Sequence, residues 1–438
     1  MSKTFRPWDV DQVWLFPPSI QDLVPPGHVA HFVRDTVRNA LDLSRIMDSY
    51  GEERGYPPYH PGMMVALLLY AYSQGVYSSR RIARGCEERL DFAAVTGMQR
   101  PDFRTVSDFR KRHLSALAGL FVQVLKLCQA AGLVKLGHVA LDGTKIKANA
   151  SKHKAMSYGR MKQAEPRLAL EVQRWLAQAA QTDKAEDRQL GAERRGDEMP
   201  DWVANKQKRL EKIRAAKAAL EAEARAADDD GSSGSSGRTK PGAKPKPLSD
   251  VPDDKAQRNF TDPDSRILPS KDGFIQGYNA QAAVDSHAQV IVAHDLTNAA
   301  SDQAQLSPLL DRTRANLGRN PDEVSADAGY CSAANLRTLA WRRIAAYIAT
   351  GRQRHGTASA TNARRHRPGL IARMARKLRR AGWRSRYRLR KQTVEPPFGQ
   401  IKHGRGFRQF LLRGIENVKG EWAMLCTSHN LLKLAKAA

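Results

Sequence analysis

Length, composition and charge narrow the class of protein before any motif is considered. The chain has 438 residues, and 72 Lys and Arg against 45 Asp and Glu give a formal net charge of +27 at pH 7. At about 100–200 residues per domain, this length suggests two to four domains. Hydrophobic residues make up 41% of the chain, enough for packed cores, which excludes a wholly disordered protein. The positive excess favours a polyanionic partner, most often nucleic acid.

The sequence patterns also argue against several cellular settings. The longest apolar run, Met63–Tyr72, has about half the length that a membrane-spanning helix needs, and residues 1–10 do not resemble a signal peptide. The four cysteines lie far apart, which fits a reducing cytoplasm rather than a disulfide scaffold. No GxxxxGK[ST] sequence occurs. We therefore expect a cytoplasmic protein with no membrane segment and no nucleotide cofactor.

Residues 1–135 are expected to form a helical N-terminal domain. Ser78 or Ser79 should cap a short basic helix, and Thr105 with Asp108 resembles a capping box before one long helix. Short basic helices joined by tight turns are typical of a helix-turn-helix DNA reader. The alternative is an ordinary helical bundle with solvated arginines.

The pattern changes near residue 138. Residues 139–141 form an apolar run that predicts a short buried strand ending at Asp142. Residues 157–227 are rich in Ala, Glu, Lys, Arg and Gln and predict two antiparallel helices forming a hairpin. Residues 228–257 contain Gly/Ser-rich and Pro/Lys-rich runs, so we expect a flexible linker there.

The last part of the chain, residues 258–438, alternates strands with helices. Residues 274–284 and 289–296 predict a β-hairpin, and Val324–Asp327 predicts a further strand that ends in a carboxylate. Strands that alternate with helices after a hairpin indicate a mixed α/β sheet.

A strongly basic segment precedes the final acid of interest. The stretch 364–391 holds 13 Arg and Lys and no Asp or Glu, which is typical of a mobile, solvated or polyanion-bound segment. Thr393 should cap the following helix. Pro396 and Pro397 fit only a first helical turn, so we expect Glu395 at the start of that helix.

Three isolated acids stand out against the basic background. Phosphoryl transfer needs mainly positioning and charge neutralisation, and Mg²⁺ held by a few carboxylates supplies both. Asp142 and Asp327 each follow an apolar strand and precede small residues, and Glu395 follows the basic segment. Each has a structural alternative, because Asp-Gly is a common turn and an acid in a first turn favours the helix dipole. Asp285 and Asp295 are the rivals for the second acid.

Four stretches of the chain resemble motifs of bacterial insertion-sequence transposases of the DDE superfamily. They are Asp142–Lys145, Gly277–Gln281, Ala326–Tyr330 and Tyr387–Lys402. The last is the most specific, because it combines basic residues with Glu395. The N-terminal half, with Trp8 and residues 57–63 and 103–112, is similar to the helical domain that precedes the catalytic core in these proteins. The likeness is weakest over residues 157–257.

This resemblance implies a ribonuclease-H-like catalytic domain formed by residues 136–156 and 258–438. It implies that Asp142, Asp327 and Glu395 are the catalytic residues and the ligands of Mg²⁺, with Mn²⁺ as the alternative. It also implies DNA cleavage by water at the inverted ends of the element and strand transfer by a 3′-hydroxyl, without a covalent protein–DNA intermediate.

The resemblance also implies partners. Basic residues of the last motif should contact DNA, namely Arg388, Arg390, Lys391 and Lys402. The expected partners are double-stranded DNA, both element ends and target, and further copies of the chain, because two ends must be cut and joined. The expected location is the bacterial cytoplasm, on the nucleoid.

Other functions remain open at this point. A DNA-binding regulator, or a decayed transposase that binds without cutting, would share every basic feature of the chain. The isolated acids distinguish the two, because carboxylates facing phosphate would only repel it in a pure binder. A related nuclease that cuts without joining is a further alternative.

Overall fold

The computed structural model describes residues 19, 22, 24–51, 58–190, 201–229, 251–270, 273–351 and 368–438. Two compact units are present, one of residues Met1–Leu133 and Ala423–Ala438 and one of residues Val134–Trp422. Residues 423–438, expected in the catalytic domain, group with the N-terminal unit, and the expected hairpin and linker fall in the same unit as the expected catalytic segments. Most of the expected linker, residues 230–250, and residues 364–367 of the basic stretch lie outside the described residues.

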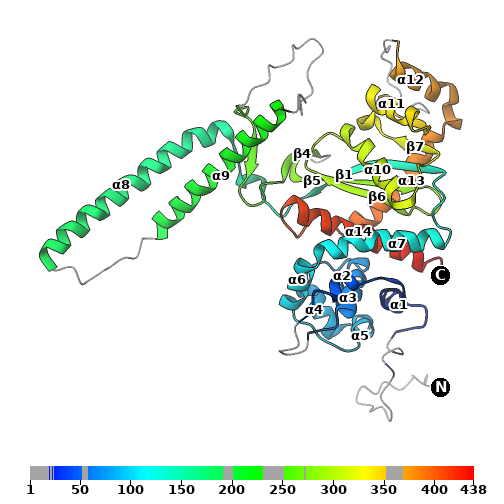
Figure 1. Cartoon of the computed structure of the whole chain (residues 1–438), viewed down its shortest axis with the longest axis horizontal. Coiled ribbons are helices and arrows are strands. Elements are labelled where there is room, and N and C mark those ends of the chain that lie inside the picture. Colours follow the sequence, from blue (N-terminus) through cyan, green and yellow to red (C-terminus); the bar gives the residue numbers. More distant parts are fainter. Residues whose placement is uncertain are drawn as a thin grey trace, which may run out of the picture. The chain divides into compact units, whose positions relative to one another are not determined.

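The N-terminal unit is helical where it is described, as predicted (Figure 1). Helix α3 (Pro61–Ser73) is apolar and buried on nearly all sides, with Leu67, Leu68 and Leu69 inaccessible to solvent. The helices are α1 (Val29–Ala40), α2 (Ser44–Met47), α3 (Pro61–Ser73), α4 (Ser79–Glu88), α5 (Leu90–Thr96), α6 (Phe103–Arg112) and α7 (Leu114–Ala130).

The caps of α4 and α6 test two predictions. Ser78 caps α4, and its hydroxyl oxygen accepts a hydrogen bond from the backbone of Arg81 at 3.2 Å, as predicted. The capping box predicted at Thr105 is wrong. Asp102 caps α6 instead, and its Oδ1 accepts from the backbone N–H groups of Arg104 (2.7 Å) and Thr105 (3.1 Å). An aspartate oxygen satisfies helix-start donors well, so the helix begins two residues before Thr105.

The long helix predicted after Thr105 is two helices, because α6 and α7 meet at His113 with a bend of 73°. Arg110 in α6 is buried, and its guanidinium donates to the Tyr72 hydroxyl, the Tyr77 carbonyl and the Ser79 hydroxyl. This arginine therefore holds the helices together and is not presented to a ligand.

No single helix among the described residues is long and apolar enough to cross a membrane. The bent pair α6 and α7 would meet the length and composition criteria only if taken together.

The second unit contains a six-stranded mixed sheet, which confirms the α/β fold class. Its strands are β1 (His138–Lys147), β4 (Arg266–Ser270), β5 (Gly273–Asp285), β6 (Ile291–Thr297), β7 (Glu323–Ala326) and β8 (Ala345–Ile348). β5 pairs antiparallel with β1 on one edge and with β4 and β6 on the other. β1, β7 and β8 are parallel neighbours. This is the mixed sheet expected of the ribonuclease-H-like domain.

Helices and a small sheet complete this unit. The connection between the parallel strands β7 and β8 is the helix α11 (Ala333–Trp341), which Ser332 caps as predicted. The other helices are α10 (Leu306–Leu317), α12 (Leu370–Ala381), α13 (Leu389–Gly399) and α14 (Ile415–Ala435), which continues into the first unit. A two-stranded sheet pairs β2 (Ala155–Ser157) with β3 (Gln257–Asn259).

The chain between β2 and β3 contains the predicted pair of antiparallel helices, α8 (Tyr158–Leu190) and α9 (Asp201–Asp229) (Figure 1). Apolar side chains along both helices form a shared core. Ion pairs flank this core: Glu171 accepts from Lys206 at 2.8 Å, and Glu165 accepts from Arg214 at 3.2 Å and Lys217 at 2.9 Å. The hairpin therefore has its own packed and charge-paired seam.

Candidate active site

Asp142 and Asp327 come together because their strands are neighbours. β1 and β7 pair in parallel with Leu141 opposite Ala326, so Asp142 and Asp327 are the next residues along the two strands. Asp327 follows its strand, as predicted. The expectation that Asp142 ends its strand is wrong, because β1 continues to Lys147 through its pairing with β5.

Small residues beside both acids leave little spare volume. Asp142 Oδ1 accepts from the Gly143 N–H at 3.0 Å, and Asp327 Oδ1 accepts from the Gly329 N–H at 2.8 Å. A Cβ on Gly143 would overlap the Gln281 amide and would lie only 2.7 Å from the Asp302 carboxylate. A larger residue at this position would therefore force the polar side chains around Asp302 to shift.

Glu395 lies on α13, which packs against β1, β5 and β7. The prediction that Glu395 occupies the first turn is wrong, because α13 begins at Leu389 and holds Pro396 and Pro397 in its second half. Proline in a helix interior removes a backbone hydrogen bond and strains the preceding turn. Burial of Val394 and other α13 side chains offsets this cost. The helix then widens into a π turn over Gln400–Gly404.

Arg390 links two of the three predicted acids. Its Nη2 lies 3.0 Å from Asp142 Oδ2 and its Nη1 lies 3.6 Å from Glu395 Oε1. The Arg390 side chain is only 10% exposed, whereas the Glu395 side chain is 54% exposed. The guanidinium therefore connects β1 to α13 and stands between Asp142 and Glu395.

The other predicted DNA-contacting residues have different surroundings. Arg388 and Lys391 are exposed. Lys402 is half-buried, and its Nζ donates to the Thr144 hydroxyl at 2.9 Å and to the Lys145 carbonyl at 3.2 Å. Lys402 therefore also secures the strand that carries Asp142.

Asp302 is a further acid beside the site, one that sequence reasoning did not single out. Its Oδ1 accepts from Asn279 Nδ2 at 2.6 Å, from Gln281 Nε2 at 2.7 Å and from Lys145 Nζ at 3.2 Å. Asn279 and Gln281 are alternate residues of one strand and so share a face of the sheet. That alternation inside the Gly277–Gln281 motif was the available signal for a buried polar partner.

The two rival acids have partners elsewhere. Asp285 accepts from the backbone N–H groups of Leu136 at 2.6 Å and His287 at 2.8 Å. Asp295 pairs with Arg312 at 3.1 Å. Both contacts stabilise a turn or a strand–helix pair of the domain.

Acidic side chains gather around Asp142 although the protein is strongly basic. Burial raises the pKa of Asp142 to about 6; the charges of Asp327 and Asp302 add to this shift, and Arg390 opposes it. Burial also raises the pKa of Tyr330 well above its usual value, and the same acids raise it further. Like charges crowded at low exposure would be relieved by a bound cation.

The donor chemistry fits a divalent metal ion. Asp142, Asp327 and Glu395 offer only carboxylate oxygens, the ligands that Mg²⁺ and Mn²⁺ prefer. Among the described residues, no three His, Cys, Asp or Glu side chains already lie close enough to hold a metal. Arg390 supplies the positive charge between Asp142 and Glu395.

A basic groove of about 930 Å³ begins at Gly143, next to Asp142. Gly143 and Thr144 belong to β1, and the exposed ring of Phe274 lines part of the wall. The charged lining residues within the groove are all basic or imidazole groups, namely Lys145, Lys147, Lys152, Lys402, His403 and Arg408. The groove therefore presents positive charge along the strand that carries Asp142.

Comparison with known families gives two matches. Residues 18–112 match the family described as Transposase domain (DUF772), and residues 254–431 match the family described as Transposase DDE domain. The second match contains Asp302, Asp327 and Glu395. It begins after Asp142, which lies before the hairpin in the sequence. No curated protein and no solved structure matches the chain.

Proposed function

Because this chain belongs to the insertion-sequence DDE transposases, we propose that it cleaves DNA at the inverted-repeat ends of its own element and transfers the strands to target DNA. The observation that supports the proposal is the alignment of Asp142 and Asp327 on neighbouring strands, with Arg390 linking Asp142 to Glu395 and a basic groove lined from Gly143 onward.

Asp142, Asp327 and Glu395 are the residues that would hold the divalent metal, Mg²⁺ or Mn²⁺, which when bound supplies positive charge to the attacking and leaving oxygens. Arg390 orients two of these carboxylates from their shared side. Lys402 and Asp302 fix the strand and its neighbours around them. The protein thus contributes mainly positioning, which is what phosphoryl transfer requires.

Tyr387 carries a phenol hydroxyl in the last motif, and the proposal does not use it as a nucleophile. Burial raises its pKa, and the charges of Asp327, Asp142 and Glu395 raise it further, against the opposing effect of Arg390. A phenol that keeps its proton is a poor nucleophile. This supports water for cleavage and a DNA 3′-hydroxyl for joining, without a covalent protein–DNA intermediate.

The basic groove would hold the phosphates of double-stranded DNA, with Arg388, Lys391 and Lys402 as further contacts. Two element ends must be cut together, so the proposal includes an oligomer of this chain on DNA. Its place of action would be the nucleoid in the bacterial cytoplasm.

A cleavage assay tests the proposal. Labelled duplexes that carry the element ends are incubated with the full chain and Mg²⁺ or Mn²⁺, then with Asp142→Ala, Asp327→Ala and Glu395→Ala. We expect each variant to bind DNA and to lose cleavage by at least about 10²-fold, a usual effect of losing one group that acts on the transition state. Asp295→Asn is the matched control, because that acid pairs with Arg312 rather than with Arg390.

The outcomes separate the alternatives. Cleavage at the wild-type rate by any of the three alanine variants would remove that residue from the active site. Binding by the intact protein without cleavage under either metal would favour a regulator or a decayed transposase. Cleaved ends that are never joined to target DNA would indicate a nuclease.

A further inference from the structure

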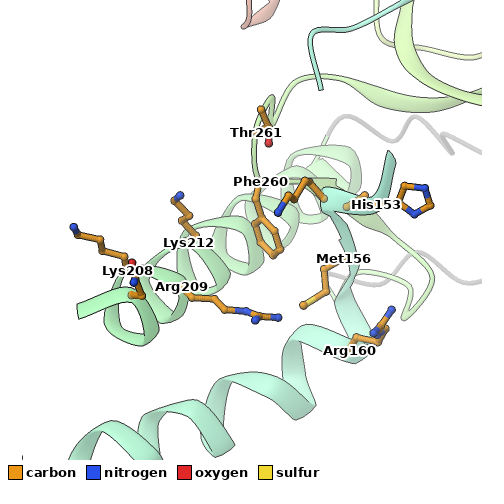
Figure 2. A pocket seen from close by; sticks show the side chains of 11 residues that line it. His153, Met156, Arg160, Lys208, Arg209, Lys212, Phe260 and Thr261 are labelled. Atoms are coloured by element: carbon orange, nitrogen blue, oxygen red, sulfur yellow. The ribbon is translucent and has the colours of Figure 1, made fainter. Parts of the chain in front are cut away.

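A second basic pocket lies at the base of the α8–α9 hairpin and shares no lining residue with the groove beside Asp142. It has a volume of about 520 Å³, within the usual range of ligand sites. Its walls come from the chain around β2, the start of α8, one face of α9 and the residues after β3 (Figure 2). The titratable side chains that line it are His153, Lys154, Arg160, Lys208, Arg209 and Lys212.

The charge of this pocket is not neutralised within the described residues. Cations on the seam of the same hairpin, such as Lys206 and Lys217, pair with Glu171 and Glu165 at 2.8 and 2.9 Å. No acid lines the pocket, and its five lysines and arginines make no ion pair with any acid in the described parts of the chain. The hairpin thus pairs its seam cations and leaves the pocket cations for another partner.

The arrangement of the α9 cations has a cost that an anion would remove. Lys208 and Lys212 are four residues apart and therefore neighbours on one helix face, where like charges destabilise the helix. Arg209 adds a third charge, and its side chain extends from α9 toward Met156 (Figure 2). A phosphate chain between these groups would convert the repulsion into attraction.

Part of the wall that faces α9 is apolar, and backbone hydrogen bonds hold it in place. The half-buried side chains of Phe260 and Met156 line it. Met156 pairs with Arg258 in the small sheet, and the Phe260 N–H donates to the Lys154 carbonyl at 3.1 Å. An aromatic ring beside several cations suits a DNA backbone, because the ring can pack on a sugar while the cations hold the phosphates.

We propose that this pocket binds a phosphodiester segment of DNA, as a contact separate from the one at the catalytic acids. The inference rests on the proposed function, since it assumes that DNA is the substrate. It assigns the inserted hairpin a role in holding DNA, and it names Lys208, Arg209 and Lys212 as the residues that supply the charge.

Binding of a labelled element-end duplex to the full chain at several salt concentrations tests the proposal. The variant Lys208→Ala/Arg209→Ala/Lys212→Ala removes three exposed pocket charges. The control Arg167→Ala/Arg174→Ala/Arg225→Ala removes three exposed charges of the same hairpin that do not line the pocket. We expect the pocket variant to bind roughly tenfold more weakly at low salt. Its plot of log K against log salt should also be less steep than that of wild type, by about 2–3 in slope. The control should change that slope by less than about 1.

A second measurement uses the unaltered protein, so that misfolding of a variant cannot decide the result. Acetylation of lysines by a water-soluble reagent is read by mass spectrometry with and without duplex. We expect the duplex to protect Lys208 and Lys212, and inorganic phosphate at the same phosphate concentration to leave them reactive. Protection by inorganic phosphate alone would identify a small-anion pocket and overturn the proposal.

The results distinguish this inference from the proposed function. If wild type binds DNA with a steep salt dependence and the two triple variants behave alike, the pocket proposal fails while the transposase function stands. If wild type binds no duplex at any salt concentration, both fail.

Discussion

At the scale of single residues, Asp142 is an acid whose ionised form the fold disfavours. Its side chain is 16% exposed and lies beside Asp327 and Asp302, so its carboxyl keeps a proton to about pH 6 in the metal-free protein. Arg390 opposes this effect without cancelling it. An acid held in this state gains from a bound cation, which would explain why a buried carboxylate is kept there.

The stability of the metal-free protein should therefore respond to pH through Asp142. The unfolded carboxyl loses its proton near pH 3.8 and the folded one near pH 6, so between these values the folded state holds more protons. Stability from this group is present below about pH 4 and is lost as pH rises through 6. Asn imitates the protonated acid, so Asp142→Asn should gain up to about 3 kcal/mol over wild type between pH 4 and pH 7.

Chemical denaturation in EDTA at several pH values measures this difference. A stability difference between wild type and Asp142→Asn that stays constant from pH 4 to pH 7 would contradict the raised pKa. Asp295→Asn serves as the control, because the Asp295 side chain is 12% exposed, close to the 16% of Asp142, and pairs with Arg312.

At the scale of elements, the site depends on how separate strands and turns are tied together. Asp302 precedes the 3-10 turn Gln303–Gln305 and accepts hydrogen bonds from β1 and β5 at once. The acid thereby holds Lys145, Asn279 and Gln281 on one side of the sheet. Its removal would leave those donors without their acceptor, and buried donors without partners are costly.

Asp302→Ala should therefore lower the free energy of unfolding by about 2–3 kcal/mol. Asp322→Ala is a matched control, since that acid is 66% exposed and pairs with Arg319 on the surface. Denaturation of both variants in EDTA gives the comparison. Equal stability of the two variants would show that the Asp302 hydrogen bonds contribute little.

At the scale of the whole molecule, the net charge of +27 should govern DNA binding. Helix α12 belongs to the acid-free basic stretch and exposes Arg376, Arg379 and Arg380. Contacts between such residues and phosphates release counterions, which makes log K fall linearly with log salt at a slope of about −0.9 per phosphate.

We expect a slope steeper than about −5 for duplex binding by the full chain, from the basic groove, α12 and the hairpin pocket together. Titrations between low and physiological salt measure it. A nearly flat dependence would contradict a role for the basic stretch in DNA binding.

The sequence by itself determined much of the secondary structure, and it was sufficient to propose Asp142, Asp327 and Glu395 as the acids of the site. The short runs at 139–141 and 324–326 predicted strands next to Asp142 and Asp327, because a buried strand needs mainly apolar or small residues. Composition likewise identified the α8–α9 pair. Secondary structure could be predicted where the periodicity or the capping residue of a single segment decides its conformation.

Only the tertiary structure decided the rest. The start of α13 was predicted wrongly from Pro396 and Pro397. Packing of this helix against the sheet allows both prolines in its second half, where proline is usually unfavourable. The interactions of Arg390 with Asp142 and Glu395 and of Asp302 with Lys145 join residues that are distant in sequence. The composition gave the net charge directly. Only the structure showed which cations form ion pairs along the hairpin and which line a pocket. Sequence spacing carries no record of such contacts, because they depend on how the sheet brings distant segments together.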